Sequence, residues 1–451
     1  MTDPSIVWLR QDLRVADQAA LTAAAAAGPV IPVYILDDET PPSGCRIGAA
    51  QRWWLHGALE HLARDLEDLG SRLVLRRGRA DTVLAALGEE TGARRIHALR
   101  HAEPWWRQAE QRLGDRLALH DGNTLAPARC VRTGSGQAYR IYSAYWRALQ
   151  SELPPPHPTP PPTRIAAPSI WPQSDRLEEW ALRPVAPNWA KHFTLEPGAD
   201  FAAVHLRNFA RRVSVYECAR NLPGEEGTSM LSPYMHFGEI SPATVWHGVD
   251  AHRHADKFRK ELAWRDFGQS LIRALPDYGS TNGNRKFDRL RWRTGKEAAA
   301  DLRAWQRGRT GYPIVDAGMR QLWHSGWMHN RVRMITASFL TKHLLIDWRE
   351  GWAWFWDTLL DADYCNNSVN WQWVAGTGVD ANMFSKIMAP LAQSEKFAAG
   401  GYIRNWIPEL CDVPDAAIHD PGPVAGYPEK IIGHREARER ALAAQRAMRS
   451  G

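Results

Sequence analysis

The chain has 451 residues, of which 44% are hydrophobic and 24% charged, and its formal net charge is +6. This composition is typical of a globular protein of two or three domains and excludes disordered and fibrous classes. Its apolar runs are too short to cross a bilayer, so no membrane association is expected.

The net charge and the cysteine pattern further limit the kinds of partner and metal site that the protein can have. A pI near 9.1 favours a polyanionic partner, although many basic proteins bind none. The five cysteines are far apart, which argues against a zinc ribbon, a redox dithiol or a four-cysteine iron–sulfur site, and no metal is expected. Their odd number and the absence of a signal-peptide pattern at the N-terminus predict a cytoplasmic protein.

The first hundred residues alternate apolar strands with helical segments. We expect strands at 5–9, 29–36, 72–76 and 95–99, and helices between the first two strands, at 49–69 and at 80–91. This alternation predicts a Rossmann-like α/β domain with a parallel sheet over residues 1–130. No GxGxxG motif follows the first strand, which disfavours the usual dinucleotide-binding variant.

A proline-rich stretch at 153–162 cannot form helix interior or central strand and should adopt polyproline II. It lies in a predicted interdomain linker, 131–200. From residue 201 to 451 the periodicity is helical, which predicts a large all-α domain ending in an exposed basic helix at 434–449.

A possible phosphate-binding segment is Gly-Thr-Ser-Met-Leu-Ser-Pro, residues 227–233. Its glycine allows unusual backbone conformations, hydroxyl side chains follow it, and Ser-Pro at its end can begin a helix. Such a segment suits phosphate binding, although a simple helix cap explains it as well. Glu261, Trp264 and Arg265 share one helical face and would suit an unstacked base, or would be an ordinary amphipathic surface with an ion pair.

Two further segments place polar groups in apolar surroundings. Arg333, in 327–334, needs a carboxylate partner, which Asp361 or Asp363 could supply. Met334 could be core filler. The segment 361–373 is dense in Asp and Asn among Trp and Leu, which predicts a polar ligand.

Together these segments resemble the DNA photolyase/cryptochrome family, and most closely the bacterial photolyases that act on cyclobutane pyrimidine dimers. The resemblance covers essentially the whole chain. It is carried by residues 7–14, 227–232, 261–267, 311–320, 326–340 and 361–373. It implies an antenna-chromophore α/β domain, a linker, and a helical domain that holds FAD.

The resemblance assigns residues to FAD and to a chain of tryptophans that would reduce it, with Asn367 facing flavin N5, which suits a reduced anionic flavin. The expected FAD contacts are Tyr216, Thr228, Ser229, Met230, Leu231, Ser232, Asn330, Arg333, Asp361, Asp363 and Asn367. The expected electron-transfer chain is Trp371, Trp348 and Trp292.

For the lesion, the resemblance implies a pocket in which two tryptophans pack against a flipped-out dimer and Glu261 meets a pyrimidine edge. Its expected residues, with Asn367 on the flavin side, are Glu261, Trp264, Asn330, Met334 and Trp373. Expected contacts to DNA are made by Arg220, Glu261, Trp264, Arg265, Asn330, Arg331, Lys386 and Gln393.

The implied function is light-driven repair of cyclobutane pyrimidine dimers, by a monomer, with electron transfer from photoexcited reduced FAD. Asn330 and Met334 stand where photolyases for (6-4) lesions have a His pair, which argues against that lesion. The alternative is a cryptochrome-type photoreceptor without repair, although the chain ends soon after the helical domain. A second antenna chromophore, deazaflavin or methenyltetrahydrofolate, is also implied.

Overall fold

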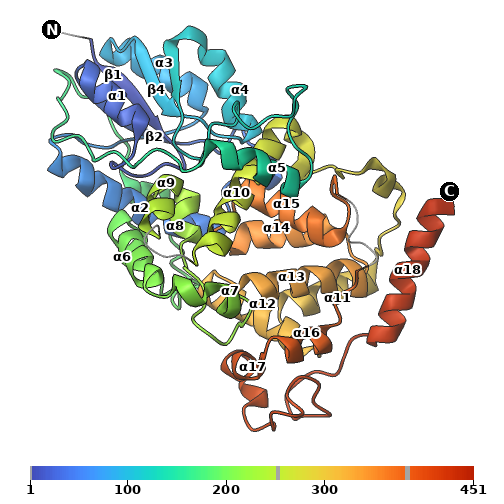
Figure 1. Ribbon diagram of the computed structural model, residues 1–451. Helices are drawn as coiled ribbons and strands as arrows, with labels where there is room; N and C mark the ends of the chain where they lie inside the picture. The colour runs from blue at the N-terminus through green and yellow to red at the C-terminus, as the bar shows by residue number, and fades with distance from the viewer. Residues whose placement is uncertain (1–2, 250–253, 381–385, 451) are drawn as a thin grey trace.

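The computed structural model describes residues 3–249, 254–380 and 386–450. An N-terminal α/β part packs against a larger helical part, and the C-terminal helix lies at the periphery (Figure 1). The predicted fold class, a parallel-sheet α/β domain followed by a large all-α domain, is confirmed.

The sheet has five parallel strands in the order β3-β2-β1-β4-β5. The strands are β1 (Ser5–Leu9), β2 (Val30–Leu36), β3 (Val74–Arg77), β4 (Arg95–Leu99) and β5 (Leu117–His120). The helices that connect or follow them are α1 (Ala19–Ala27), α2 (Ala49–Asp68), α3 (Ala80–Thr91) and α4 (Pro104–Leu113). Every residue of β1 is buried, as expected for a central strand covered on both faces.

Sequence periodicity located the first four strands and three helices, with β3 starting two residues later than predicted. It missed α4 and β5. Strand β5 is four residues long and half-buried at the sheet edge, so it has neither a long apolar run nor clear alternation. The predicted linker also contains a helix, α5 (Tyr142–Leu149).

The rest of the described chain is helical, as predicted. Its helices are α6 (Ala199–Ala210), α7 (Tyr216–Ala219), α8 (Ser232–Phe237), α9 (Pro242–Gly248), α10 (Asp256–Ala274), α11 (Lys296–Gln306), α12 (Pro313–Ser325), α13 (Asn330–Ser338), α14 (Trp348–Thr358), α15 (Tyr364–Ala375), α16 (Pro390–Lys396), α17 (Gly400–Trp406) and α18 (His434–Ser450). None of the helices in the described ranges is both long and apolar enough to cross a membrane.

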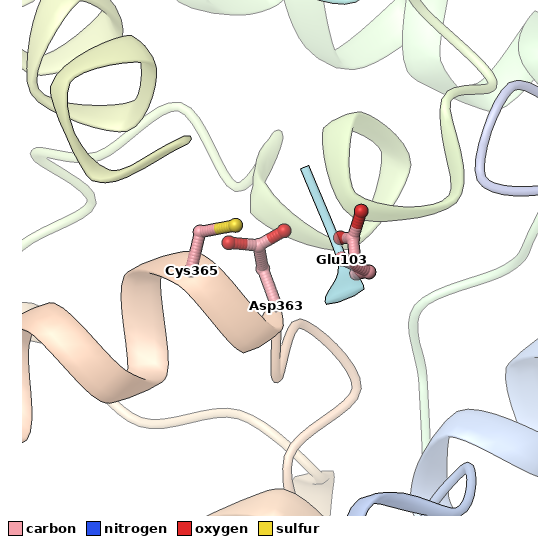
Figure 2. Close-up of side chains that lie close together, drawn as sticks. All are labelled: Glu103, Asp363 and Cys365. Carbon is pink, nitrogen blue, oxygen red and sulfur yellow. The ribbon is translucent and has the colours of Figure 1, made fainter. Parts of the chain in front are cut away.

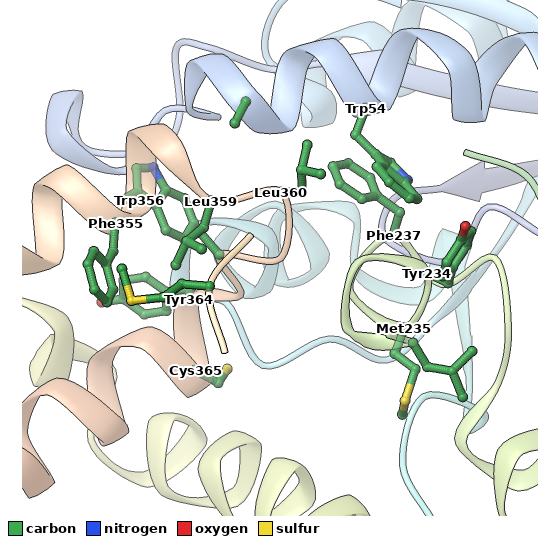
Figure 3. Packing of buried hydrophobic residues seen from close by; sticks show 14 of the residues in the cluster. Trp54, Tyr234, Met235, Phe237, Phe355, Trp356, Leu359, Leu360, Tyr364 and Cys365 are labelled. Atoms are coloured by element: carbon green, nitrogen blue, oxygen red, sulfur yellow. The ribbon is translucent and has the colours of Figure 1, made fainter. Parts of the chain in front are cut away.

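One hydrophobic cluster runs through both parts of the molecule (Figure 3). Trp54 of α2 is fully buried, and its ring centroid lies 5.0 Å from that of Tyr234 and 6.3 Å from that of Phe237, both in α8. Its indole Nε1 donates to Glu239 Oε2 at 2.8 Å. This shared core holds the two parts in one orientation.

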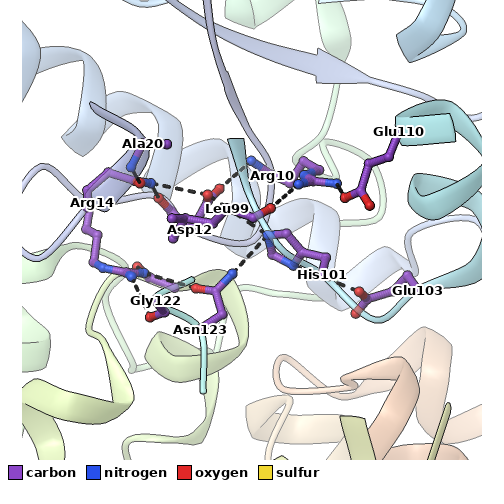
Figure 4. Close-up of polar contacts among 12 residues, drawn as sticks. Arg10, Asp12, Arg14, Ala20, Leu99, His101, Glu103, Glu110, Gly122 and Asn123 are labelled. Atoms are coloured by element: carbon purple, nitrogen blue, oxygen red, sulfur yellow. Dashed lines mark hydrogen bonds and ion pairs between the residues drawn. The ribbon is translucent and has the colours of Figure 1, made fainter. Parts of the chain in front are cut away.

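The segment after β1 makes polar contacts with residues at and beyond the ends of β4 and β5 (Figure 4), and it also contacts the helical part. Arg14 donates to the carbonyl oxygens of Gly122, at 3.0 Å, and of Gly238 in the helical part, at 2.9 Å. Asp12 accepts from the backbone N–H of Arg10 at 2.5 Å and is fully buried. The motif at 7–14 therefore builds the junction between the two domains.

Candidate functional site

A cavity of about 590 Å³ opens in the helical part. Its wall combines residues from α7, the segment 228–232, α10, α13, α14 and α15. The wall consists of Tyr216, Arg220, Thr228, Ser229, Met230, Leu231, Ser232, Lys257, Glu261, Trp264, Trp327, Met328, Asn330, Arg331, Arg333, Met334, Ala337, Phe355, Leu359, Asp361, Ala362, Asn366, Asn367, Asn370, Trp371, Trp373 and Val374.

One side of the cavity is the segment 228–232, held tightly against α7. Gly227 permits this approach, because a Cβ there would overlap the backbone of Ala219. Met230 adopts a left-handed conformation with φ of 53°, which costs a non-glycine residue energy. The strained backbone turns the hydroxyl-bearing residues on either side of Met230 into the cavity wall.

The inner wall contains a charged pair and an oriented amide. Arg333 and Asp361 form a two-fold hydrogen-bonded ion pair, both distances being 2.9 Å, so Asp361 is the carboxylate partner that Arg333 requires. Asn367 Nδ2 donates to the carbonyl oxygen of Trp352 at 3.1 Å. With its N–H group used in this way, the amide of Asn367 offers Oδ1 to a ligand.

The outer wall is formed by α10 and its neighbours. Arg220 donates to Glu261, and although burial opposes the charge of Arg220, this carboxylate raises its pKa above the ordinary value. Trp264 donates from Nε1 to Asn370 Oδ1 at 3.0 Å, and its ring centroid lies 4.6 Å from that of Tyr142. The carboxylate and the indole are therefore held in fixed positions before any ligand binds.

The start of α13 supplies the remaining polar groups. Asn330 is exposed at the cavity, and Arg331 donates to Asn221 Oδ1 at 2.6 Å and contacts the Met334 sulfur at 3.6 Å. His329 caps the helix through Nδ1, which accepts from the N–H of Arg331. Burial and then Arg333 and Arg331 lower the pKa of His329 to about 4, so the capping imidazole is neutral.

Comparisons with known proteins match this architecture over the full chain. One family profile, described as DNA photolyase, matches residues 5–163, and another, the FAD binding domain of DNA photolyase, matches residues 258–447. A deoxyribodipyrimidine photo-lyase of Agrobacterium fabrum is 45% identical over 99% of this chain and 98% of its own. The chain belongs to the DNA photolyase family.

Solved and curated relatives extend this result. A bacterial class III photolyase from Agrobacterium tumefaciens superposes with a TM-score of 0.94 at 43% identity, covering 100% of this chain and 98% of that one. Cryptochrome-2 of Arabidopsis thaliana is 33% identical over 93% of this chain and 73% of its own length. Photolyases are thus nearer than cryptochromes, and the function is DNA repair by a photolyase.

The cavity suits the FAD that this family binds. Its volume is in the range of pockets for small molecules, about 300–1,000 Å³. The hydroxyls of Thr228, Ser229 and Ser232 fit a pyrophosphate, and Arg333 with Asp361 and Asn367 fit the polar edges of a flavin or a sugar. Apart from Asp363, all the residues predicted to contact FAD line this one cavity.

Two of the three predicted electron-transfer tryptophans are buried. Trp371 lines the cavity and packs against Gly351, where a Cβ would overlap its ring. Gly351 lies one helical turn after Trp348, which is fully buried and donates to Asn282 Oδ1 at 2.9 Å. Trp292 is half-buried in the segment before α11. Of the three, Trp371 lines the cavity and Trp292 is the most exposed, and their action as an electron-transfer chain stays a prediction.

Asp363 is not among the residues that line the cavity, and its contact with FAD stays a prediction. It is the N-cap of α15, where its carboxylate accepts from the N–H of Asn366 at 2.7 Å. Its side chain lies beside Glu103 and Cys365, all three buried, and this trio is the one group of possible metal ligands among the described residues (Figure 2). Burial and then the charge of Asp363 raise the pKa of Glu103 to about 7.

Arg265 is also outside the cavity wall, and its contact with DNA stays a prediction. Its guanidinium is mostly buried and donates to the carbonyl oxygen of Asn123 at 2.5 Å, in the other domain. Two other predicted DNA contacts lie apart from the cavity: Lys386 is exposed just after the undescribed residues 381–385, and Gln393 is half-buried in α16.

Several cavity residues were not identified from the sequence. Lys257 lies one helical turn before Glu261, so the i, i+4 spacing would have found it. Asn366 and Asn370 belong to the polar segment 361–373 but received no role. Phe355, Leu359 and Val374 carry no local signal, because an apolar wall residue and an apolar core residue look the same in sequence.

Proposed function

We propose that the protein splits cyclobutane pyrimidine dimers in DNA under blue or near-ultraviolet light, and that the cavity holds both FAD and the flipped-out dimer. The observation that carries this proposal is the continuity of one cavity wall. Asn367 and Trp371 lie on the expected flavin side, while Glu261, Trp264 and Trp373 lie on the expected lesion side. A donor and an acceptor bound there would be in direct contact.

Bound reduced FAD would supply the excited electron donor for this reaction. The residues of this chain would bind and orient the cofactor and the dimer, and they would exclude water from the cavity. Asn367, whose N–H group is held by the carbonyl oxygen of Trp352, would offer its Oδ1 to the N–H of reduced flavin, and the Arg333–Asp361 pair would hold the polar side of the cofactor. Thr228, Ser229 and Ser232 would hold its phosphates.

On the lesion side, two indole rings provide flat surfaces for the dimer. Glu261 and Asn330 provide hydrogen-bonding groups for pyrimidine edges, and the contact with Arg220 keeps the Glu261 carboxylate in place. Arg220 and Arg331 line the cavity and would meet phosphates, so DNA affinity should fall with added salt. Because a dimer stacks poorly, extruding it costs less than extruding an intact pair.

The proposal also includes a second, light-harvesting chromophore, either a deazaflavin or methenyltetrahydrofolate, in the α/β domain. A cavity of about 430 Å³ beside α2 and β3 offers space for it. We further propose a cytoplasmic monomer without a metal. The five free cysteines agree with a reducing compartment.

The deciding experiment illuminates the reduced, flavin-loaded protein with an oligonucleotide that contains one thymine dimer. We expect restored thymines by chromatography in the light and none in the dark. Acid release from the same protein should give FAD near one per chain. Light-dependent reduction of the flavin without restored thymines would favour a photoreceptor and contradict the proposal.

A further inference from the structure

A second, smaller cavity lies next to the first one and shares two of its walls. Its volume is about 230 Å³, and Trp264 and Trp373 line both cavities. The two indoles therefore separate the cavities, and any group in the small cavity would contact the same rings that are expected to hold the lesion. This small cavity has no role in the reaction as described above.

The small cavity has an apolar floor and an exposed mouth. The floor is formed by Phe267, Leu271, Tyr278 and Val369, all of which are buried. At the mouth, the side chain of Ile141 is 53% exposed. An exposed aliphatic side chain above an aromatic floor is a surface that binds flat, apolar rings.

The size and charge of the cavity narrow the ligand. Its 230 Å³ lies below the range of about 300–1,000 Å³ for drug-sized ligands, so it suits a single ring system. Two charged residues line the cavity: Asp380, which is half-buried, and Arg140, which is exposed and carries a guanidinium that can pair with a phosphate. A planar ring attached to a phosphate backbone fits both features.

Helix α5 holds the mouth rigidly beside the lesion wall. Tyr142 donates from its hydroxyl to the carbonyl oxygen of Lys260 at 2.6 Å, and its ring packs on Trp264. Tyr145 lies 5.5 Å, between ring centroids, from Phe267. Because α5 is fixed to α10 in this way, the small cavity is formed before DNA binds.

We propose that the small cavity receives one nucleobase that flanks the dimer in the same strand. This inference rests on the proposed function. Extruding the dimer removes a stacking partner from each flanking base, so one of them can move outward with the strand. The outward base would stack between the Trp264 ring and the apolar floor of the small cavity. The guanidinium of Arg140 would pair with the phosphate of that nucleotide.

The test measures the affinity of the flavin-loaded protein, in the dark, for dimer-containing oligonucleotides. One substrate has normal flanks, two carry an abasic site immediately 5′ or 3′ of the dimer, and a fourth, a duplex, carries it in the opposite strand. Loss of one stacked base should weaken binding about 5- to 30-fold. We expect this loss for one of the two same-strand abasic sites.

Variants at the mouth assign the effect to the cavity. Ser143 is exposed there, and in Ser143→Phe the new ring should occupy the cavity, so that normal and abasic flanks bind within twofold of each other. Ser143→Ala, the matched control, should keep the wild-type difference. Ile141→Trp blocks the cavity from a position two residues earlier and repeats the test if Ser143→Phe folds poorly.

Three results would overturn the inference. They are equal binding of all four substrates by the wild type, a loss confined to the opposite-strand abasic site, or an unchanged loss in both Ser143→Phe and Ile141→Trp. A wild type that does not prefer dimers to undamaged DNA would overturn the proposed function as well. An intact dimer preference without a flank effect overturns the inference alone.

Discussion

Helices α10 and α15 each face two different parts of the molecule. Toward the cavity, α10 presents Glu261 and Trp264, and α15 presents Asn367. Toward the α/β domain, α10 presents Asp266, which accepts from the N–H of Leu125 at 2.6 Å, and the first turn of α15 presents Asp363 beside Glu103. The same types of side chain therefore serve two purposes on one pair of helices.

The two faces differ in how their polar groups are satisfied. At the junction, backbone groups of the other domain complete the hydrogen bonds, as the carbonyl oxygen of Asn123 does for Arg265. At the cavity, some side chains pair with each other next to open space, as Glu261 does with Arg220, although Asn367 donates to the carbonyl oxygen of Trp352. Junction residues should therefore control stability, and cavity residues should control ligands.

The largest expected effect is at the cavity. In Trp371→Phe, photoreduction of oxidised flavin should be abolished, because the indole nearest the cavity no longer passes an electron inward. Repair by chemically reduced protein should persist, since ring opening does not use this chain. Flavin absorption under illumination and restored thymines measure the two activities. Loss of repair in the pre-reduced variant, with DNA binding intact, would contradict this role.

At the junction, Arg265→Ala should lower the free energy of unfolding by about 1–3 kcal/mol, because it leaves the carbonyl oxygen of Asn123 without its hydrogen-bond donor. Urea unfolding followed by circular dichroism measures the change. The exposed pair of Arg285 with Asp288 is the control, and Arg285→Ala should cost less than about 1 kcal/mol. If Arg265→Ala instead bound damaged and undamaged DNA more weakly and kept its free energy of unfolding, the result would support a contact between Arg265 and DNA.

Back at the cavity, Glu261→Ala should reduce the preference for dimer-containing over undamaged DNA by about 1–3 kcal/mol, because a hydrogen bond to the lesion is lost. Affinity for undamaged DNA should not fall, since Arg220 becomes available to phosphate. Glu261→Gln keeps a hydrogen-bonding group and should lose less. Titrations with matched duplexes give the ratio. An unchanged ratio in Glu261→Ala would separate this carboxylate from lesion recognition.

The smallest expected effect depends on pH at the junction. The pKa of Glu103 is raised from 4.5 to about 7, so the folded protein holds a proton that the unfolded chain releases. This contribution to stability is present at low pH and lost as the pH rises toward 7. Glu103→Gln should therefore gain about 1–2 kcal/mol relative to wild type between pH 5 and pH 8.

Unfolding measured at both pH values tests this prediction, with Glu60→Gln, at an exposed position of α2, as the control. A constant difference between Glu103→Gln and wild type across this range would show that Glu103 does not hold the extra proton.

The strands and helices of the α/β domain could be predicted wherever buried apolar residues repeat with the spacing of a strand or a helix. Strand β4 and helix α3 have the predicted ends, because their burial and their caps are local properties of the sequence. Strand β5 was missed because its residues are only half-buried at the sheet edge. The helical domain was predicted as a class, since helical spacing is also local.

The orientation of the site residues was harder to predict. Spacing put Glu261, Trp264 and Arg265 on one face of α10, and all three do lie within the same broad arc. Spacing does not say which neighbouring element each residue meets, and the long side chain of Arg265 reaches Asn123 in the other domain. Spacing likewise does not show that the carboxylate of Asp363 caps α15. The family resemblance indicated which residues belong to the site, and only the folded structure shows which residues each of them contacts.

The contact at Gly238 has an optical consequence. This residue has φ of 69°, and a Cβ there would overlap the backbone of Gln11 and Asp12, so the two domains meet main chain to main chain. No side-chain rotation can change the separation at such a point. Excitation energy transfer depends steeply on the distance and mutual angle of two dyes. A pigment bound in the α/β domain would therefore transfer excitation energy to the flavin with the same efficiency in every copy of the protein.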